Sequence, residues 1–231
     1  MTSVDRSHTR PDGGVSSGRL IRHTGIDRLY HWCMAAAVVT LLATGFLPVV
    51  GVKFGWVEPH WIAGSVLAVL VLVHIVRASF FQDIWAMVVV PTDVRDAWRE
   101  LRHAFGRGGP APGKPGKYEL LQKLYHAGAA LVVLSAIVTG GMMMVKIDTP
   151  FWKRNPYWLS DSTWGVVYVV HGFAALATLT LLMIHVYFAI RPEKLWMTRS
   201  MIVGWITRDE YTEHHDSARW TADPADSGRR S

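Results

Sequence analysis

The residues of this chain best suited to chemistry are histidines that recur inside its hydrophobic runs. His171 and His185 lie fourteen residues apart in the last run, and His60 and His74 repeat that interval in an earlier run. Fourteen residues of helix make about four turns and span about 21 Å. Each pair therefore lies on nearly one face of a helix, with its imidazoles near opposite sides of a hydrocarbon layer about 30 Å thick.

Imidazoles divided between two depths favour haem over other metal sites. Histidine inside a membrane is costly and usually functional, and histidines at repeated intervals are hard to explain by packing alone. A tetrahedral zinc site needs its ligands at one place, whereas haem iron takes two axial imidazoles. The single cysteine, Cys33, excludes a disulfide framework, a thiolate cluster and covalent c-type attachment. These residues predict two haems b.

The depth of each histidine sorts the candidate ligands. The outer layer contains His60 and His171, which we expect to share one haem. Four histidines fall in the inner layer: His31, His74, His126 and His185. His185 is the strongest candidate there, but spacing alone leaves its partner open. The equal intervals on the second and fourth runs favour His74.

Four long runs, almost free of charge, must position these histidines. They cover about residues 29–50, 59–80, 121–145 and 164–190, and half of the 231 residues are hydrophobic. Each run is long enough to cross a bilayer, which needs about 20 apolar residues. Little chain remains for a soluble core. We predict an all-α integral membrane protein, a bundle of four transmembrane helices.

The two halves of the chain repeat each other. Leu124-Tyr125-His126 echoes Leu29-Tyr30-His31, and Thr139-Gly140 follows its histidine by thirteen residues, as Thr44-Gly45 does. With the equal histidine intervals, these matches predict two repeated helical hairpins.

The net charge of +6 is explained by topology rather than by a nucleic-acid partner. Basic residues gather before the first run, between the second and third, and after the fourth, which places both termini in the cytoplasm. We expect a multi-pass protein of the bacterial inner membrane. Its predicted parts are a disordered cytoplasmic arm (1–21), a cytochrome domain (22–206) containing an interfacial segment and linker (81–118), and a cytoplasmic tail (207–231).

Several short motifs together resemble a known family. They are Arg28-Leu29-Tyr30-His31-Trp32, His60, Gly116-Lys117-Tyr118 with Gln122-Lys123, and His171 with His185. This pattern resembles the gamma subunit of membrane formate dehydrogenases and the wider group of prokaryotic dihaem cytochromes b561. The resemblance implies two haems b, the outer on His60 and His171 and the inner on His31 and His185. The family pattern has no histidine at positions 74 and 126.

The resemblance also implies a quinone pocket beside the inner haem, at the start of the third helix. Gln122 and Lys123 match the family pattern, whereas Glu119 and Leu121 stand where asparagine and glycine are expected. A pocket of Glu119, Gln122 and Lys123 therefore has changed polar chemistry. Glu119 could pass protons, or it could be a solvated carboxylate favoured by the start of a helix.

We predict a subunit that carries electrons across the membrane between a quinone pool and a periplasmic partner. The resemblance implies that this partner is the iron–sulfur subunit of a molybdenum or tungsten oxidoreductase, although another periplasmic redox protein would fit the same role. Two alternatives remain. One is a stand-alone membrane haem reductase for a soluble acceptor, and the other is a noncatalytic anchor whose histidines only pack and hydrogen-bond.

Overall fold

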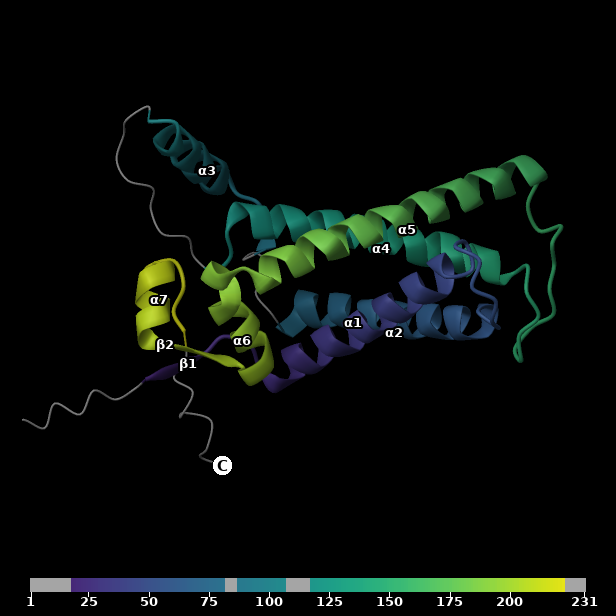
Figure 1. Ribbon diagram of the computed structural model, residues 1–231, viewed down its shortest axis with the longest axis horizontal. Helices are drawn as coiled ribbons and strands as arrows, with labels where there is room; N and C mark the ends of the chain where they lie inside the picture. The colour runs from purple at the N-terminus through teal and green to yellow at the C-terminus, as the bar shows by residue number, and fades with distance from the viewer. Residues whose placement is uncertain (1–17, 82–86, 107–116, 223–231) are drawn as a thin grey trace, which may run out of the picture.

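The computed structural model describes residues 18–81, 87–106 and 117–222 (Figure 1). Four of the described helices are long and apolar enough to cross a membrane: α1 (Gly25–Phe46), α2 (Val57–Phe81), α4 (Leu120–Met144) and α5 (Asp161–Ile190). They begin close to the expected positions, except that α1 starts at Gly25 rather than 29. Large apolar side chains such as Val69, Leu131 and Phe173 are more than half exposed along them, as a surface in contact with lipid requires.

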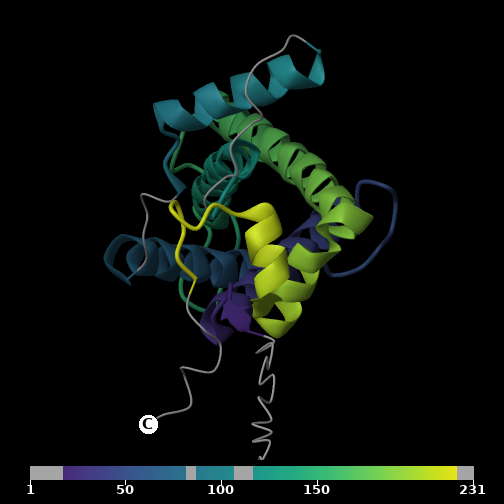
Figure 2. The same ribbon diagram turned by 90° about the vertical axis from the view of Figure 1, so that its left-hand side faces the viewer.

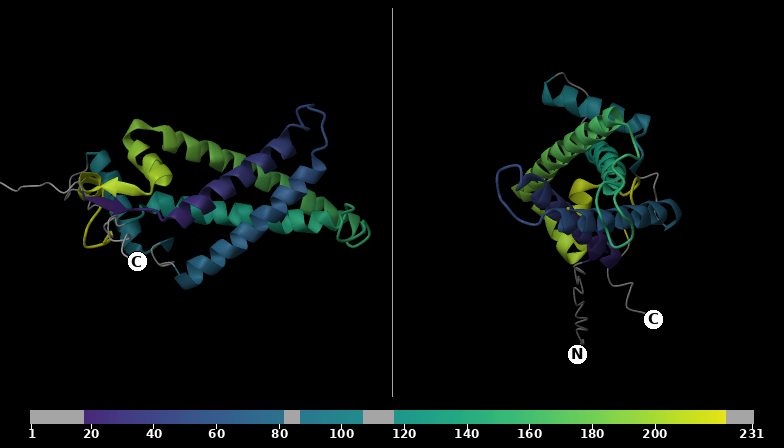
Figure 3. Two further views of the ribbon diagram at one scale, coloured as in Figure 1. Left: turned by 90° about the horizontal axis from the view of Figure 1, so that it is seen from below. Right: turned by 90° about the vertical axis from the view of Figure 1, so that its right-hand side faces the viewer.

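The four long helices form two hairpins, α1–α2 and α4–α5, whose loops lie at the same end of the bundle (Figures 1 and 3). Each helix packs on two others, in the circular order α1, α2, α4, α5. The first hairpin crosses the second at a wide angle (Figure 3). We call the end with the two loops the loop end, and the end with the short elements the cap end.

Local capping explains why α1 begins earlier than its apolar run. The Thr24 hydroxyl accepts a hydrogen bond from the Asp27 amide at 3.2 Å, and the Asp27 carboxylate accepts one from the Thr24 amide at 3.0 Å. This reciprocal pair satisfies amides that the first helical turn leaves without partners. Charged residues at a helix start therefore belong to the helix, although a search for apolar residues passes over them.

The cap end corrects two expectations, that of a disordered arm up to residue 21 and that of a purely α-helical fold. Arg19–Ile21, placed in a disordered arm, forms strand β1, which pairs antiparallel with β2 (Trp205–Thr207), so the fold is mostly rather than purely α-helical. Leu20, Ile206 and Tyr211 form a small buried cluster there. The pairing joins segments that are far apart in the sequence, so no local sequence pattern predicts it. The expectations for residues 1–17 and 223–231 lie outside the described residues.

Three short helices complete the cap end: α3 (Pro91–Ala104), α6 (Leu195–Val203) and α7 (Arg208–His214), with a 3-10 turn, η2 (Pro192–Lys194), before α6. Helix α3 lies within the segment expected at the membrane interface, and Figure 2 shows it outside the four long helices. An ion pair of 2.7 Å between Asp93 and Lys123 ties it to α4. The linker within residues 107–116 and the stretch 82–86 lie outside the described part of the chain.

Candidate functional site

The outer histidines face each other across the bundle, near the loop end. His60 lies in the first turn of α2 and His171 in α5, and their ring centroids are 6.3 Å apart with planes at 72°. A metal bond to imidazole nitrogen is about 2.0 Å long, and the ring centre lies about 1.1 Å behind that nitrogen, so rings on opposite sides of one iron have centroids about 6.2 Å apart. Two imidazoles joined by a direct hydrogen bond would have centroids about 5.2 Å apart. The observed separation fits a shared metal.

A threonine decides which nitrogen of His60 is available. The Thr44 hydroxyl lies 2.7 Å from the Thr40 carbonyl, to which it donates its one proton, and 2.8 Å from Nδ1 of His60. Nδ1 must therefore carry the hydrogen and donate to Thr44, which leaves the lone pair of Nε2 for a metal. A Cβ added at Gly45 would lie 3.6 Å from this ring, so α1 approaches it closely.

His171 is held in the same way by the second hairpin. The Thr139 hydroxyl donates to the Ser135 carbonyl at 2.6 Å and lies 2.9 Å from Nδ1 of His171. A Cβ at Gly140 would lie only 3.2 Å from Cε1 of His171, so a larger residue would push the ring aside. The Thr-Gly pairs that marked the sequence repeat thus orient the two outer imidazoles.

The two residues predicted to ligate the inner haem come from different helices and lie close together. His31 of α1 faces His185 of α5, with ring centroids 6.2 Å apart and planes at 46°. Tyr125 stacks on His185 at 5.7 Å and donates its hydroxyl to the Leu181 carbonyl at 3.0 Å. Nδ1 of His31 is buried and has no hydrogen-bond partner in the part of the chain that the structure describes.

His74, which equal spacing favoured as the partner of His185, faces His126 of α4 instead, with ring centroids 6.3 Å apart. Within the described ranges, no three His, Cys, Asp or Glu side chains converge on a point that could hold a metal ion. Opposed pairs of imidazoles suit a metal that brings its own equatorial ligands, as haem iron does.

A family comparison agrees with this geometry. The model of a family described as prokaryotic cytochrome b561 matches residues 22–204. This chain belongs to the prokaryotic cytochrome b561 family. The cytochrome is also similar to a protein of Bradyrhizobium diazoefficiens named "Probable Ni/Fe-hydrogenase B-type cytochrome subunit", with 26% identity over 208 residues, which cover 77% of this chain and 79% of that protein.

Membership confirms the cytochrome b561 part of the predicted resemblance, and with it a membrane cytochrome that uses haem b. The histidine pairs fit haem, because the two imidazole rings of each pair lie at the separation that an iron bound between their nitrogens requires. The closer resemblance to the formate dehydrogenase gamma subunit stays a prediction.

The three residues predicted for a quinone pocket lie at the start of α4 and contact other cap elements. The Gln122 side chain accepts a hydrogen bond from the Glu119 amide at 3.1 Å, and Lys194 lies 3.3 Å from the Glu119 carboxylate. Lys123 is buried and bonds both Asp93 and the Val88 carbonyl. All three residues therefore have structural partners, and the Glu119 side chain is still 45% exposed.

The cap end contains a buried arginine that sequence reasoning did not single out. Arg22 is 5% exposed, its Nη1 lies 2.8 Å from Nε2 of His215, and its guanidinium lies 4.9 Å from the centre of the Trp196 ring. The ring of His214 stacks on that of Trp196, with the two ring centroids 4.6 Å apart. The His214-His215 pair in the tail therefore packs the cap. The sequence did not predict this contact, because Arg22 and His215 are more than 190 residues apart.

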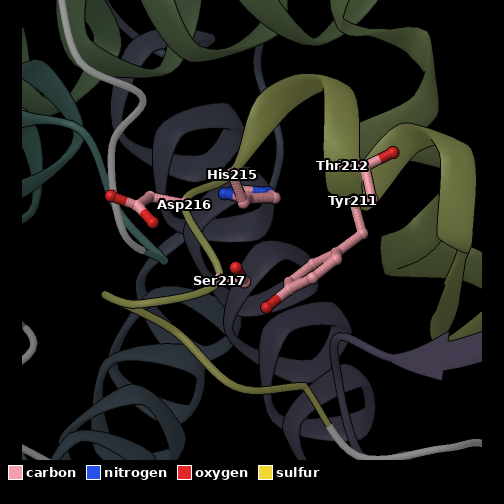
Figure 4. A pocket seen from close by; sticks show the side chains of 5 residues that line it. All are labelled: Tyr211, Thr212, His215, Asp216 and Ser217. Carbon is pink, nitrogen blue, oxygen red and sulfur yellow. The ribbon is translucent and has the colours of Figure 1, made fainter.

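A shallow hollow lies on the outside of this cap (Figure 4). Its lining residues come from α7 and the chain just after it: Tyr211, Thr212, His215, Asp216 and Ser217. The ring of His215 is turned toward Arg22 through their hydrogen bond, so the hollow is bounded by the packed cap and is separate from the histidine pairs of the bundle.

Proposed function

We propose that this cytochrome carries electrons across the bacterial inner membrane between a quinone pool and a periplasmic oxidoreductase. His60 and His171 would hold an outer haem b, and His31 and His185 an inner one. The observation that carries the proposal is the placement of two opposed imidazole pairs along α5, whose histidines are fourteen residues, or about 21 Å, apart. Haem iron, when bound, accepts and returns one electron at a time.

The residues of the chain supply position and electronic tuning for those ligands. Thr44 and Thr139 fix the outer imidazoles in the tautomer that presents Nε2. Tyr125 holds the ring of His185 from one side. Apolar helices around the pairs keep water away, which is a second means of setting a redox potential.

Both termini are proposed to be cytoplasmic, with the inner pair toward the cap end. The basic connections support this orientation through the positive-inside rule. The short loops at the other end then face the periplasm, where the exposed aromatic side chains of Phe151, Tyr157 and Trp158 offer a surface for a partner protein. An internal repeat of two hairpins is also part of the proposal, supported by the matching Thr–His contacts.

We propose that quinone binds near Glu119, Gln122 and Lys123, beside the inner pair. Glu119 is the candidate for proton transfer, because its carboxylate is partly exposed and quinone chemistry exchanges protons as well as electrons. Gln122 would cap α4, and Lys123 would position α3 through Asp93.

The proposed partner is the iron–sulfur subunit of a molybdenum or tungsten oxidoreductase, as in formate dehydrogenase, or another periplasmic redox protein. The short motifs support a formate dehydrogenase, while the Bradyrhizobium relative, named as a hydrogenase cytochrome subunit, supports a hydrogenase. Purification from the native membrane distinguishes these partners by the metal content and activity of the co-purifying subunits. A cytochrome that purifies alone and reduces a soluble acceptor would instead support the stand-alone reductase.

Haem analysis of the purified cytochrome tests the proposal directly. We expect a b-type spectrum that a quinol or a quinol analogue reduces. His60→Ala should remove one haem per chain without abolishing quinol reduction of the remainder, whereas His31→Ala should remove the inner haem and block that reduction. Wild-type protein without haem would leave only the noncatalytic anchor, and an unchanged spectrum in His31→Ala would refute the inner ligand.

A further inference from the structure

The family resemblance leaves one pair of facing histidines without a role. His74 of α2 and His126 of α4 have ring centroids 6.3 Å apart with planes at 59°. The two pairs assigned above have centroids 6.2 and 6.3 Å apart. We propose that His74 and His126 bind a third haem b at the cap end of the bundle.

The third pair is the counterpart of the inner pair in the other half of the chain. His126 follows Leu124-Tyr125 as His31 follows Leu29-Tyr30, and His74 follows His60 by the interval that separates His171 from His185. The inner pair joins α1 to α5, and the third pair joins α2 to α4; through these two helix pairs the first hairpin packs on the second. The two pairs thus lie on different sides of the bundle, while the outer pair joins α2 to α5 across it.

Packing or hydrogen bonding explains the pair less well. Neither His74 nor His126 forms a hydrogen bond or an ion pair with another described residue, and their ring separation exceeds the roughly 5.2 Å of directly hydrogen-bonded imidazoles. Imidazole inside a membrane span without such a partner is costly. Binding a metal from both sides would compensate both rings.

The donor set selects the ligand class. A bare transition-metal ion needs about four ligands, and no third His, Cys, Asp or Glu joins this pair among the described residues. Two opposed imidazoles are sufficient for a haem iron, whose macrocycle supplies the other four ligands. His126 is exposed and His74 is half-buried. The inner pair shows the same combination, with His185 exposed and His31 half-buried.

The inference rests on the proposed function, because it extends the same cofactor to a further site. The test is the number of haems b per chain in the full-length cytochrome, expressed with added haem precursor and measured by the pyridine haemochrome against protein content. His74→Phe and His126→Phe keep the volume of the ring but remove the ligand. His103→Ala, an exposed histidine of α3, is the matched control.

We expect three haems per chain in the wild type and in His103→Ala, and two in each phenylalanine variant, with His31→Ala and His60→Ala also losing one each. Electron paramagnetic resonance should show the loss of one low-spin bis-imidazole signal in the phenylalanine variants. A ratio of two in the wild type overturns the third site and leaves the proposed function standing if both phenylalanine variants also contain two. A wild type without haem overturns both proposals.

If one phenylalanine variant fails to fold, the variant on the other helix and the wild-type ratio still decide the question. Three haems in the wild type that persist in the folded variant would also overturn the assignment, since the third haem would then depend on other ligands.

Discussion

At the scale of single residues, the proposed outer haem site shows how a hydroxyl can orient an imidazole toward a metal. Thr44 and Thr139 each donate to a carbonyl one turn earlier and accept from an imidazole Nδ1–H. This arrangement fixes the tautomer and increases the electron density on Nε2, which would stabilise ferric iron relative to ferrous iron in the proposed outer haem. The same residues lie next to glycines that let the imidazoles approach α1 and α4.

Replacement of Thr44 by valine should weaken the binding of the outer haem without changing the shape of the helix. We expect haem affinity to fall by about 10–100-fold and the midpoint potential of the outer haem to rise, because His60 loses its acceptor. A redox titration followed by visible absorbance measures both effects. Thr40→Val is the control, since the Thr40 hydroxyl bonds the Ala36 carbonyl instead of an imidazole. Equal potentials in the two variants would contradict the proposed role of Thr44.

At the scale of elements, the cap joins the two ends of the chain below the bundle. The amides of Arg22 and His23 both donate to the Gly204 carbonyl, at 2.9 and 3.0 Å, next to the β1–β2 pair. Gly204 has φ of 94°, and a Cβ there would lie 3.0 Å from the His23 carbonyl oxygen. A glycine is required at this turn for both conformation and space.

The cap should loosen in mild acid. Burial, reinforced by the positive charges of Arg22 and Lys117, lowers the pKa of His23 from 6.5 to about 4. The folded cap therefore binds fewer protons than the unfolded segment between these values, and its stability falls as the pH drops below 6.5. At pH 5.5 the loss is about 1 kcal/mol. This loss of stability should appear as faster hydrogen–deuterium exchange of residues 19–23 and 205–211 at pH 5.5 than at pH 7, after correction for the intrinsic rate.

His23→Gln removes the titrating group and is the control for this effect. Exchange in the variant should change less between pH 7 and 5.5 than in the wild type. An identical pH dependence would show that another group controls the cap.

At the scale of the whole molecule, the bundle has one imidazole pair toward the loop end and two toward the cap end. Helix α5 contributes to one pair at each level, and α2 does the same through His60 and His74. The proposed electron transfer between the two membrane surfaces requires that the bundle has one fixed orientation.

Cysteine labelling tests that orientation. In a Cys33→Ser background, a membrane-impermeant maleimide should label Lys53→Cys and Lys153→Cys, in the two loops, in intact spheroplasts. Arg102→Cys and Ser217→Cys, both exposed at the cap end, should be labelled at least about tenfold more after permeabilisation, as the positive-inside rule predicts. The opposite pattern would reverse the topology and place the quinone site outside.

The capping residues show why part of the fold could be predicted and part could not. Four apolar runs become helices because lipid offers no partners to the backbone, so each span must satisfy its own hydrogen bonds. Hydrophobicity therefore locates the spans, but the start of α1 depends on polar contacts between Thr24 and Asp27, which add no apolar residues. The β1–β2 pair and the Arg22–His215 contact depend on residues nearly the whole chain apart.

The histidines show the same division at the candidate site. Spacing along one helix is set by the fixed rise of that helix, so the sequence by itself determined that the imidazoles lie in two layers and that His60 and His171 share the outer one. The spacing of residues along a helix does not predict which helices are neighbours. Only the tertiary structure decided that His31 faces His185 and that His74 faces His126, because the crossing of the two hairpins selects which side chains meet.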